Sequence, residues 1–384
     1  MRALIALLSV LLLGACTSLG PNSEARALFD DKAFTPPAEP ISAQRVFAVS
    51  EAMQRYLQGP AAERMIQLGL KAGLVDALYK QDQLKLEYDS ETTRTAAEAF
   101  DAKAGNCLSL VIMTAAFAKE LGLAVRFQRY TADPTLGRSA NLQFSIDHIN
   151  VTLDTRPPDP QLGQLVVDSM TVDFLPPEDL RGLRVRQVSE ATVIAMFMNN
   201  RAAESLAQGQ VDAAYWWARE AIRSDRRFTS AYNTLGVIYR RHGEPAAAMR
   251  AFDEALELEP SNTQALFNQA DVMAEQGRVA EAAALRERLA KIDPEPAFSF
   301  FERGRAAMDA GDYATARDLF AREVARAPYY HEFHFWLALA HFHLGELPLA
   351  QRELQLARDN STTGKDRSRY GAKLEHLRSL QSTR

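Results

Sequence analysis

Cys107 is one of only two cysteines in this 384-residue chain, and the residues around it predict a helix tip. Gly105 and Asn106 precede it, and asparagine is a favoured residue at a helix N-cap. The apolar stretch Leu108–Leu121 follows and ends at Gly122, as expected for a helix buried in a core. In the first turn of a helix, the dipole and the unpaired amides favour the thiolate form of a cysteine. Cys107 is therefore a candidate nucleophile, and the alternative is an inert thiol packed in a core.

A thiolate nucleophile needs a neighbouring base, and the base needs a group that orients it. His148 is the only histidine between residues 84 and 190, and it lies in FSIDHINVTL, where the alternation of apolar residues changes phase. A polar residue at such a break can face a cleft, although a structural strand histidine is the ordinary alternative. Asp168, which closes the apolar run in LVVDSM, is the candidate third member. Asp154 and Asp173 also remain candidates for this role.

These residues lie in a segment whose patterns mix helices and strands. Two amphipathic helical patterns run from Ala43 to Lys80 and break near Gly59. The runs LAVRFQRY, QFSIDHINVTLD and QLVVDSM are rich in branched and aromatic residues and are bounded by turn formers, which is typical of strands. Residues 43–190 are therefore predicted to form an α+β domain with the helix of Cys107 at its centre.

The order of these candidates resembles that of the transglutaminase-like superfamily, which is related to papain. The likeness covers about residues 84–175, where LEYDSETTRTAAEAFDAKAGNC leads to the cysteine and β-rich runs with His148 and Asp168 follow. It implies an α+β transglutaminase-like (papain-like) fold and acyl transfer at an amide bond. In that chemistry Cys107 attacks the carbonyl, His148 moves the proton and Asp168 orients the imidazole. One departure is Asn150, at a position where the family often has an aromatic residue.

No cofactor or metal is predicted for this domain. Animal crosslinking members of the superfamily use calcium, but the chain has no DxDxDG-like loop. The stretch HEFHFWLALAHFHLG places His331 and His334 on one helical face, so a metal site there is one interpretation. Their spacing is three residues rather than the four of HExxH, and aromatic neighbours favour packing between helices instead.

After Val193 the sequence is helical throughout and repeats itself. Glycines and alanines each recur every 34 residues, at Gly209, Gly243, Gly277, Gly311 and Gly345, and at Ala214, Ala248, Ala282, Ala316 and Ala350. The pattern resembles the tetratricopeptide repeat, in which a glycine reverses the chain between paired helices and an alanine lets them approach closely. Five repeats are predicted over residues 195–364, followed by a polar capping helix over residues 365–384. The concave face of such a solenoid suits a protein or peptide partner.

The first residues, MRALIALLSVLLLGAC, combine Arg2 with an apolar core too short to span a bilayer, which is typical of a secretory signal. The ending LGAC resembles the bacterial lipoprotein box, and this resemblance implies acylation of Cys16. Residues 1–15 are then a signal peptide, and the proline-containing residues 16–42 are a tether. Thr17 favours sorting to the outer membrane, with the protein facing the periplasm. A plain signal peptide with a chance cysteine is the alternative.

The function that these patterns favour is that of a membrane-anchored, cysteine-dependent hydrolase or acyl transferase whose repeats bind a partner or present the substrate. The alternative is a non-catalytic periplasmic scaffold in which the repeats carry the biology. A net charge of −5 and the lack of a basic cluster argue against a nucleic-acid partner. Because solenoid stability depends mainly on neighbouring repeats, the two domains are expected to unfold independently.

Overall fold

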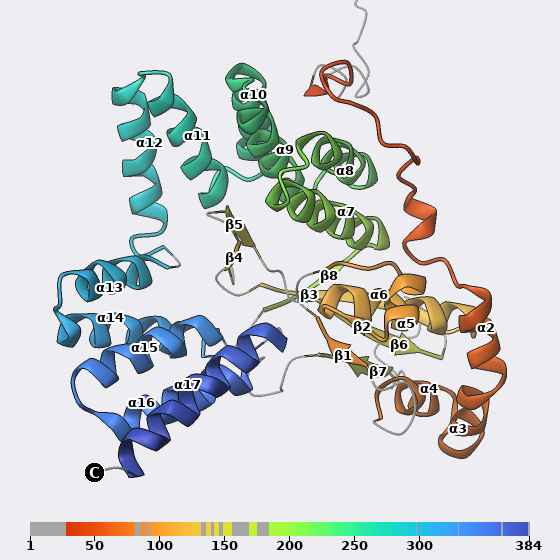
Figure 1. Ribbon diagram of the computed structural model, residues 1–384. Coiled ribbons are helices and arrows are strands. Elements are labelled where there is room, and N and C mark those ends of the chain that lie inside the picture. Colours follow the sequence, from red (N-terminus) through yellow and green to blue (C-terminus); the bar gives the residue numbers. More distant parts are fainter. Residues whose placement is uncertain are drawn as a thin grey trace, which may run out of the picture.

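The computed structural model describes residues 28–80, 86–89, 92–131, 136–139, 142–145, 149–155, 169–174, 184–296, 298–328, 330–361 and 364–382. Figure 1 shows an N-terminal part of helices and short strands, from which paired helices continue and curve round. The predicted signal segment and Cys16, His148 and Asp168 all lie outside the described residues.

The helices of the N-terminal part are η1 (Ala43–Arg45), α2 (Glu51–Gln58), α3 (Pro60–Leu68), α4 (Leu70–Tyr79), α5 (Ala96–Ala102) and α6 (Cys107–Glu120). Ser50 caps α2 by accepting a hydrogen bond from the Met53 amide. Pro60 begins α3, as expected of a residue that lacks a backbone N–H. The predicted break near Gly59 is present, and a second break at Gly69, whose φ is +83°, turns α3 back along α4.

The central sheet has the strand order β7-β6-β3-β8, and each neighbouring pair is antiparallel. Its strands are β3 (Ala124–Thr131), β6 (Ile149–Asp154), β7 (Ser169–Val172) and β8 (Arg184–Val188). Two smaller pairs accompany it, the parallel β1 (Glu87–Tyr88) and β2 (Ala104–Gly105), and the antiparallel β4 (Leu136–Ser139) and β5 (Leu142–Ser145). Strand β6 is buried along its whole length and packs against α6.

The predicted strands are present with one difference in their limits. LAVRFQRY forms β3, and QFSIDHINVTLD contributes β5 and β6. In QLVVDSM, by contrast, the strand that pairs with β6 begins at Ser169, directly after Asp168, and extends to Val172. The apolar run that suggested a strand ending at Asp168 lies outside the described residues.

The C-terminal part consists of paired helices. The pairs are α7 (Glu190–Ala207) with α8 (Val211–Ser224), α9 (Thr229–His242) with α10 (Pro245–Leu258), α11 (Thr263–Glu275) with α12 (Val279–Ile292), α13 (Ser299–Asp309) with α14 (Tyr313–Arg326), and α15 (His331–His343) with α16 (Leu347–Asp359). All five turn glycines have φ between +74° and +87°, a backbone conformation that favours glycine. All five periodic alanines are fully buried. The chain therefore uses the repeat residues in the roles that their spacing predicted.

A last helix, α17 (Gly364–Ser382), covers the end of the helix array. It packs on α16, and its Tyr370, Leu374 and Leu377 are buried against Phe335 and Leu354. The opposite face of α17 carries exposed lysine and arginine side chains. This arrangement is that of the predicted polar capping helix. None of the helices in the described ranges combines the length and the apolar character needed to span a bilayer.

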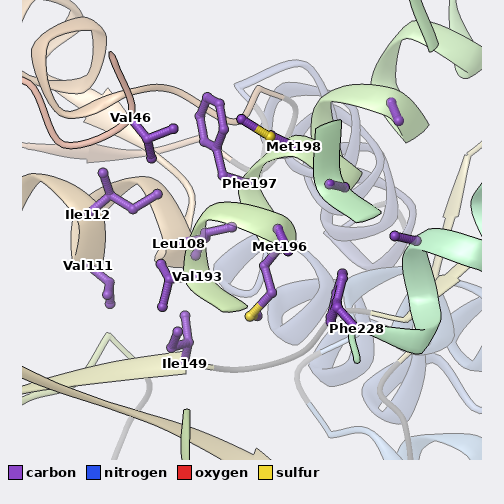
Figure 2. Packing of buried hydrophobic residues seen from close by; sticks show 14 of the residues in the cluster. Val46, Leu108, Val111, Ile112, Ile149, Val193, Met196, Phe197, Met198 and Phe228 are labelled. Atoms are coloured by element: carbon purple, nitrogen blue, oxygen red, sulfur yellow. The ribbon is translucent and has the colours of Figure 1, made fainter. Parts of the chain in front are cut away.

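One continuous hydrophobic core joins the N-terminal part to the first helix pairs and extends into α11. Figure 2 shows Val193 and Phe197 of α7 in the same cluster of buried side chains as Leu108 and Ile112 of α6 and Val46. This shared core argues against independent unfolding of the two parts, which stays a prediction for an unfolding experiment. Helix α6 is apolar on nearly every side, and α7 supplies one of the surfaces that cover it.

A second connection is made by residues 28–35, which lie along α8 and α9. The ring of Phe34 stacks on Tyr215 with centroids 3.9 Å apart. The Tyr239 hydroxyl donates to the Leu28 carbonyl at 2.8 Å, and the Tyr215 hydroxyl donates to an Asp31 carboxylate oxygen at 2.7 Å. Residues 28–35 belong to the predicted tether of residues 16–42, and this part of that prediction is wrong, because the segment is bound to the repeats and does not form a free spacer.

The packing inside a helix pair gives a first testable prediction. An alanine Cβ at position 236 would lie 2.4 Å from a ring carbon of Phe252, so Gly236→Ala should lower the free energy of unfolding by about 1–3 kcal/mol. The control is Gly371→Ala in α17, where the nearest atom would be 3.8 Å away. That change should be neutral or stabilise by up to about 1 kcal/mol. Urea titrations of both variants check this, and wild-type stability of Gly236→Ala would contradict it.

Candidate functional site around Cys107

Cys107 is the first residue of α6, and its side chain is partly exposed. Asn106 is the N-cap, and its Oδ1 accepts a hydrogen bond from the Ser109 amide at 2.9 Å. The Leu110 amide donates to the Asn106 carbonyl, which is the first hydrogen bond of the helix. The Cys107 amide donates to no acceptor in the described part of the chain. The predicted helix tip is present, with a thiol and a first-turn amide at the same position.

The cap is itself held by the loop before α5. Asn106 Nδ2 donates to Thr93 Oγ1 at 2.8 Å, and the Arg94 amide donates to Ser109 Oγ at 2.8 Å. Ser109 Oγ donates in turn to Asn106 Oδ1. A Cβ on Gly105 would lie 2.8 Å from the Ser109 Cβ, so glycine is needed for the chain to pass this close. The GNC motif therefore works as one unit, in which each residue has a separate structural task.

The direction of α6 fixes which end of the sheet Cys107 approaches. Leu121 and Gly122, which has φ +73°, reverse the chain between α6 and β3, so α6 and β3 run in opposite directions. In the ladder of β3 with β6, Ala124 at the start of β3 pairs with Asp154, and Arg129 near its end pairs with Ile149. Cys107, at the far end of α6, therefore lies toward the Ile149 end of β6.

Tyr79 gives independent support for this placement. Its hydroxyl hydrogen-bonds the Leu110 carbonyl in the first half of α6 and Thr114 at the middle of the helix. Its ring packs edge-on against Phe174, with centroids 5.2 Å apart. Phe174 follows Asp173, which in turn follows the last residue of β7. The half of α6 that begins with Cys107 and the β7 end that leads to Asp173 thus meet at the same side chain.

Asp154, one of the three candidate acids, belongs to the opposite end of the sheet. Its carboxylate is fully buried and accepts two hydrogen bonds from Arg126, from Nε at 2.6 Å and from a terminal nitrogen at 3.1 Å. Ser169 Oγ donates to the same carboxylate. Burial acts to raise the pKa of Asp154, but these hydrogen bonds and the Arg126 charge leave the pKa below its usual value. Asp154 is therefore part of a structural ion pair.

Asp173 belongs to a polar cluster at the Cys107 end. Asn150 Nδ2 donates to Asp173 Oδ2 at 3.0 Å and to the Tyr130 hydroxyl at 3.0 Å. Burial and the Asp173 charge raise the pKa of Tyr130. Asn150 is almost completely buried, and its Oδ1 has no hydrogen-bond partner among the residues that the structure describes. Unpaired buried polar atoms are uncommon in proteins and call for an explanation, so this cluster is a candidate part of the site.

The described residues place Cys107 and two of the candidate acids, but not the predicted base. By sequence, His148 directly precedes Ile149, the first residue of β6, and Asp168 directly precedes Ser169, the first residue of β7. Both lie outside the described residues. In the sequence Asn150 stood out only as a departure from a family pattern, and its contacts with Asp173 and Tyr130 were not predicted. The available signal was its position two residues after His148, because residues two apart share a side wherever a strand is continuous.

The histidines of the last helix pair have partners within the helix array. His334 is buried, its Nδ1 lies 2.6 Å from Glu353 Oε2, and its Nε2 lies 2.7 Å from the Pro328 carbonyl. His331 Nδ1 lies 2.9 Å from the Tyr370 hydroxyl, and burial lowers the pKa of His331. Groups of three or more histidine, cysteine, aspartate or glutamate side chains that could hold a metal are absent from the described residues. Packing between helices is therefore the interpretation that the contacts favour.

Comparison with known proteins identifies the repeats. A tetratricopeptide repeat family model matches residues 233–295 and 301–363. The human protein O-mannosyl-transferase TMTC3 is 37% identical over 94 residues, which is 23% of this chain and 10% of that protein. The chain thus spans about a tenth of the length of this relative. The C-terminal region consists of tetratricopeptide repeats, and such repeats indicate a role in protein interaction.

Several solved structures are similar to part of this chain. TTC0263, a tetratricopeptide protein of Thermus thermophilus, is 17% identical with a TM-score of 0.31, and the match covers 47% of this chain and 98% of that one. PilF of Pseudomonas aeruginosa is 18% identical with a TM-score of 0.29, covering 50% and 97%. YrrB, a tetratricopeptide protein with an unusual peptide-binding site, is 17% identical with a TM-score of 0.25, covering 45% and 89%.

The ion pair of Asp154 gives a pH-dependent prediction. A carboxyl whose pKa is lowered by folding stabilises the protein above its unfolded pKa of about 3.9, and this stability is lost as the pH falls through the folded pKa. Asp154→Asn should therefore cost up to about 3 kcal/mol at pH 7 and should flatten the loss of stability below about pH 4. Urea titrations at several pH values test this. Glu281→Gln removes an exposed ion pair with Arg278 and should change little.

Proposed function

We propose that this protein is a transglutaminase-like, cysteine-dependent hydrolase or acyl transferase that acts on an amide bond in a protein or peptide bound by its repeats. The observation that carries the proposal is the environment of Cys107. A partly exposed thiol stands at the first position of a buried helix, toward the end of the sheet that holds Asp173 and Asn150, and its own amide donates to no acceptor among the described residues. The repeats supply the protein-interaction surface.

The proposed reaction uses the groups of this chain in two steps. The Cys107 thiolate attacks the amide carbonyl, and the Cys107 N–H donates to the oxyanion that forms. The carbon–nitrogen bond then breaks, His148 gives its proton to the departing amine, and an acyl thioester remains on Cys107. In the second step His148 takes a proton from water or from an amine, which attacks the thioester and releases the thiolate. Water gives hydrolysis, which we favour, and an amine gives transfer.

The pairing of β6 with β7 favours Asp173 as the acid that orients His148. Asn150, which follows His148 by two residues, is hydrogen-bonded to Asp173 at the Cys107 end of β6. Asp168 lies outside the described residues, and Ser169, which follows it in the sequence, pairs with Asp154 at the other end of the ladder. The spacing in the sequence favours Asp168 for this role, so the two acids are to be compared directly.

A second candidate function is that of a non-catalytic scaffold. The observation that favours it is that the Asp173 carboxylate already accepts a hydrogen bond from Asn150 rather than being open. In this alternative the N-terminal part closes the solenoid and Cys107 is a small side chain beside a cap. The two functions differ in the reactivity of Cys107.

Alkylation of Cys107 by iodoacetamide at pH 6.5 separates the two. Because a helix tip and a nearby imidazole both favour thiolate, the rate should be at least about tenfold above that of a free model thiol. His148→Ala should lower the rate part of the way, since the helix tip remains. Asp173→Asn or Asp168→Asn, whichever orients the histidine, should slow peptide-amide cleavage more than it slows alkylation. Equally slow alkylation of wild type and all variants would end the enzyme proposal and leave the scaffold.

We also propose that Cys16 is acylated and holds the protein at the outer membrane, facing the periplasm. The support is the LGAC ending of the apolar N-terminal stretch. Cys16→Ser should leave the protein without lipid, which detergent partitioning and mass spectrometry of the mature N-terminus detect. Recovery of the wild-type protein from a periplasmic extract made without detergent would refute the anchor.

A further inference from the structure

We infer that the first repeat helix is a working part of the cysteine site, in which Glu204 of α7 is a positioning residue that holds the cap of the Cys107 helix in place. The inference rests on the proposed function only for its catalytic consequence. Its structural content concerns a chain of hydrogen bonds that leads from α7 to Asn106 through one buried residue, Thr93.

Side chains of α7 bind both backbone groups of Thr93. Glu204 Oε1 accepts a hydrogen bond from the Thr93 amide at 2.8 Å, and an Arg201 terminal nitrogen donates to the Thr93 carbonyl at 3.1 Å. The Thr93 hydroxyl also hydrogen-bonds the Glu204 carboxylate. Arg201 and Glu204 are themselves within ion-pair distance, at 3.8 Å. Thr93 is completely buried, so its amide has no water to replace Glu204 if that acceptor is removed.

Thr93 then passes this restraint to the cap. Its hydroxyl oxygen accepts from Asn106 Nδ2 at 2.8 Å, while Asn106 Oδ1 accepts from the Ser109 amide. The hydroxyl can accept from Asn106 and donate to Glu204 at the same time, so the three side chains form a continuous series. Because Asn106 both caps α6 and precedes Cys107, its position decides where the thiol and the first-turn amides point.

The rest of the contact between the two helices explains why Glu204 has this role. Helices α6 and α7 run in opposite directions, since Lys119 near the end of α6 pairs with Glu190 at the start of α7. Apolar side chains such as Val193 and Leu108 fill the space between these two polar contacts. The Glu190 contact is exposed, whereas burial raises the pKa of Glu204, as expected for a carboxyl enclosed by protein. Of these two polar contacts of α7, the one made by Glu204 is the contact that leads to Asn106, the N-cap of the Cys107 helix.

Hydrogen–deuterium exchange of the full-length protein tests the inference at the cap itself. Glu204→Ala removes the acceptor, and amides in residues 105–110 should exchange at least about tenfold faster than in wild type. Glu204→Gln keeps an acceptor oxygen in the same place and should stay within about twofold of wild type. Glu190→Ala is the matched control, because it removes the other polar contact between the same helices and should leave these amides unchanged.

The outcomes of this experiment decide the inference independently of catalysis. Wild-type exchange in Glu204→Ala, or equal acceleration in Glu204→Ala and Glu190→Ala, would overturn it. If Glu204→Ala does not fold, Arg201→Met keeps Glu204 but removes the bond to the Thr93 carbonyl together with the ion pair to Glu204. It should accelerate the same amides about threefold, and no acceleration would overturn the inference. Alkylation of Cys107 at pH 6.5 should fall about fivefold in Glu204→Ala and recover in Glu204→Gln. A wild-type thiol that is unreactive refutes the proposed function, while the exchange result still stands.

Discussion

The burial of helix α6 on nearly every side is the constraint on which the rest of the structure depends. Every residue from Leu108 to Ala118 is buried, so this stretch of the helix has no face exposed to solvent. Strand β6 covers one side, α4 and α5 contact others, and α7 covers another. Each helix that encloses α6 must bring an apolar stripe of its own. The first repeat helix is therefore needed by the N-terminal part as much as by the solenoid.

This shared core changes how the solenoid ends. In a repeat array each pair buries its outer faces on its neighbours, so the two terminal pairs need covers. At the C-terminal end the cover is α17, which buries Tyr370 and Leu374. At the N-terminal end it is α6, reinforced by residues 28–35, which bind to α8 and α9 through Phe34 and Leu28. The N-terminal part is thus both a candidate catalytic unit and the cap of the first repeat.

The sequence predicts best where a single backbone or packing requirement selects the residue. Turn glycines such as Gly243 need positive φ, and periodic alanines such as Ala248 have no room for a larger side chain, so both are visible as a strict period. The Asn106 cap is visible for a similar reason, because capping selects few residue types. The solenoid and the helix tip could therefore be predicted before the structure was known.

Long-range pairing could not be predicted in the same way. In the sequence Asp154, Asp168 and Asp173 look alike, because each lies near the end of an apolar run. The pattern of a single strand also does not tell how that strand pairs with its neighbours. The ladder separates them by placing Asp154 beside Arg126 and Asp173 beside Asn150. The role of Glu204 was equally hidden, because its partner Thr93 is 111 residues away.

The direction of the chain explains why these polar groups divide between two ends of the sheet. A helix that begins with a capped, partly exposed residue and then becomes wholly buried offers polar groups only at its tip. The short turn at Gly122 sends β3 back along α6, so the antiparallel ladder with β6 has one end near that tip and one end away from it. At the distant end Asp154 needs an arginine to be tolerated in the core. At the near end Asn150 of β6 joins Asp173 and Tyr130 by hydrogen bonds, so the polar groups of this end come from β6, from β3 and from the residue after β7.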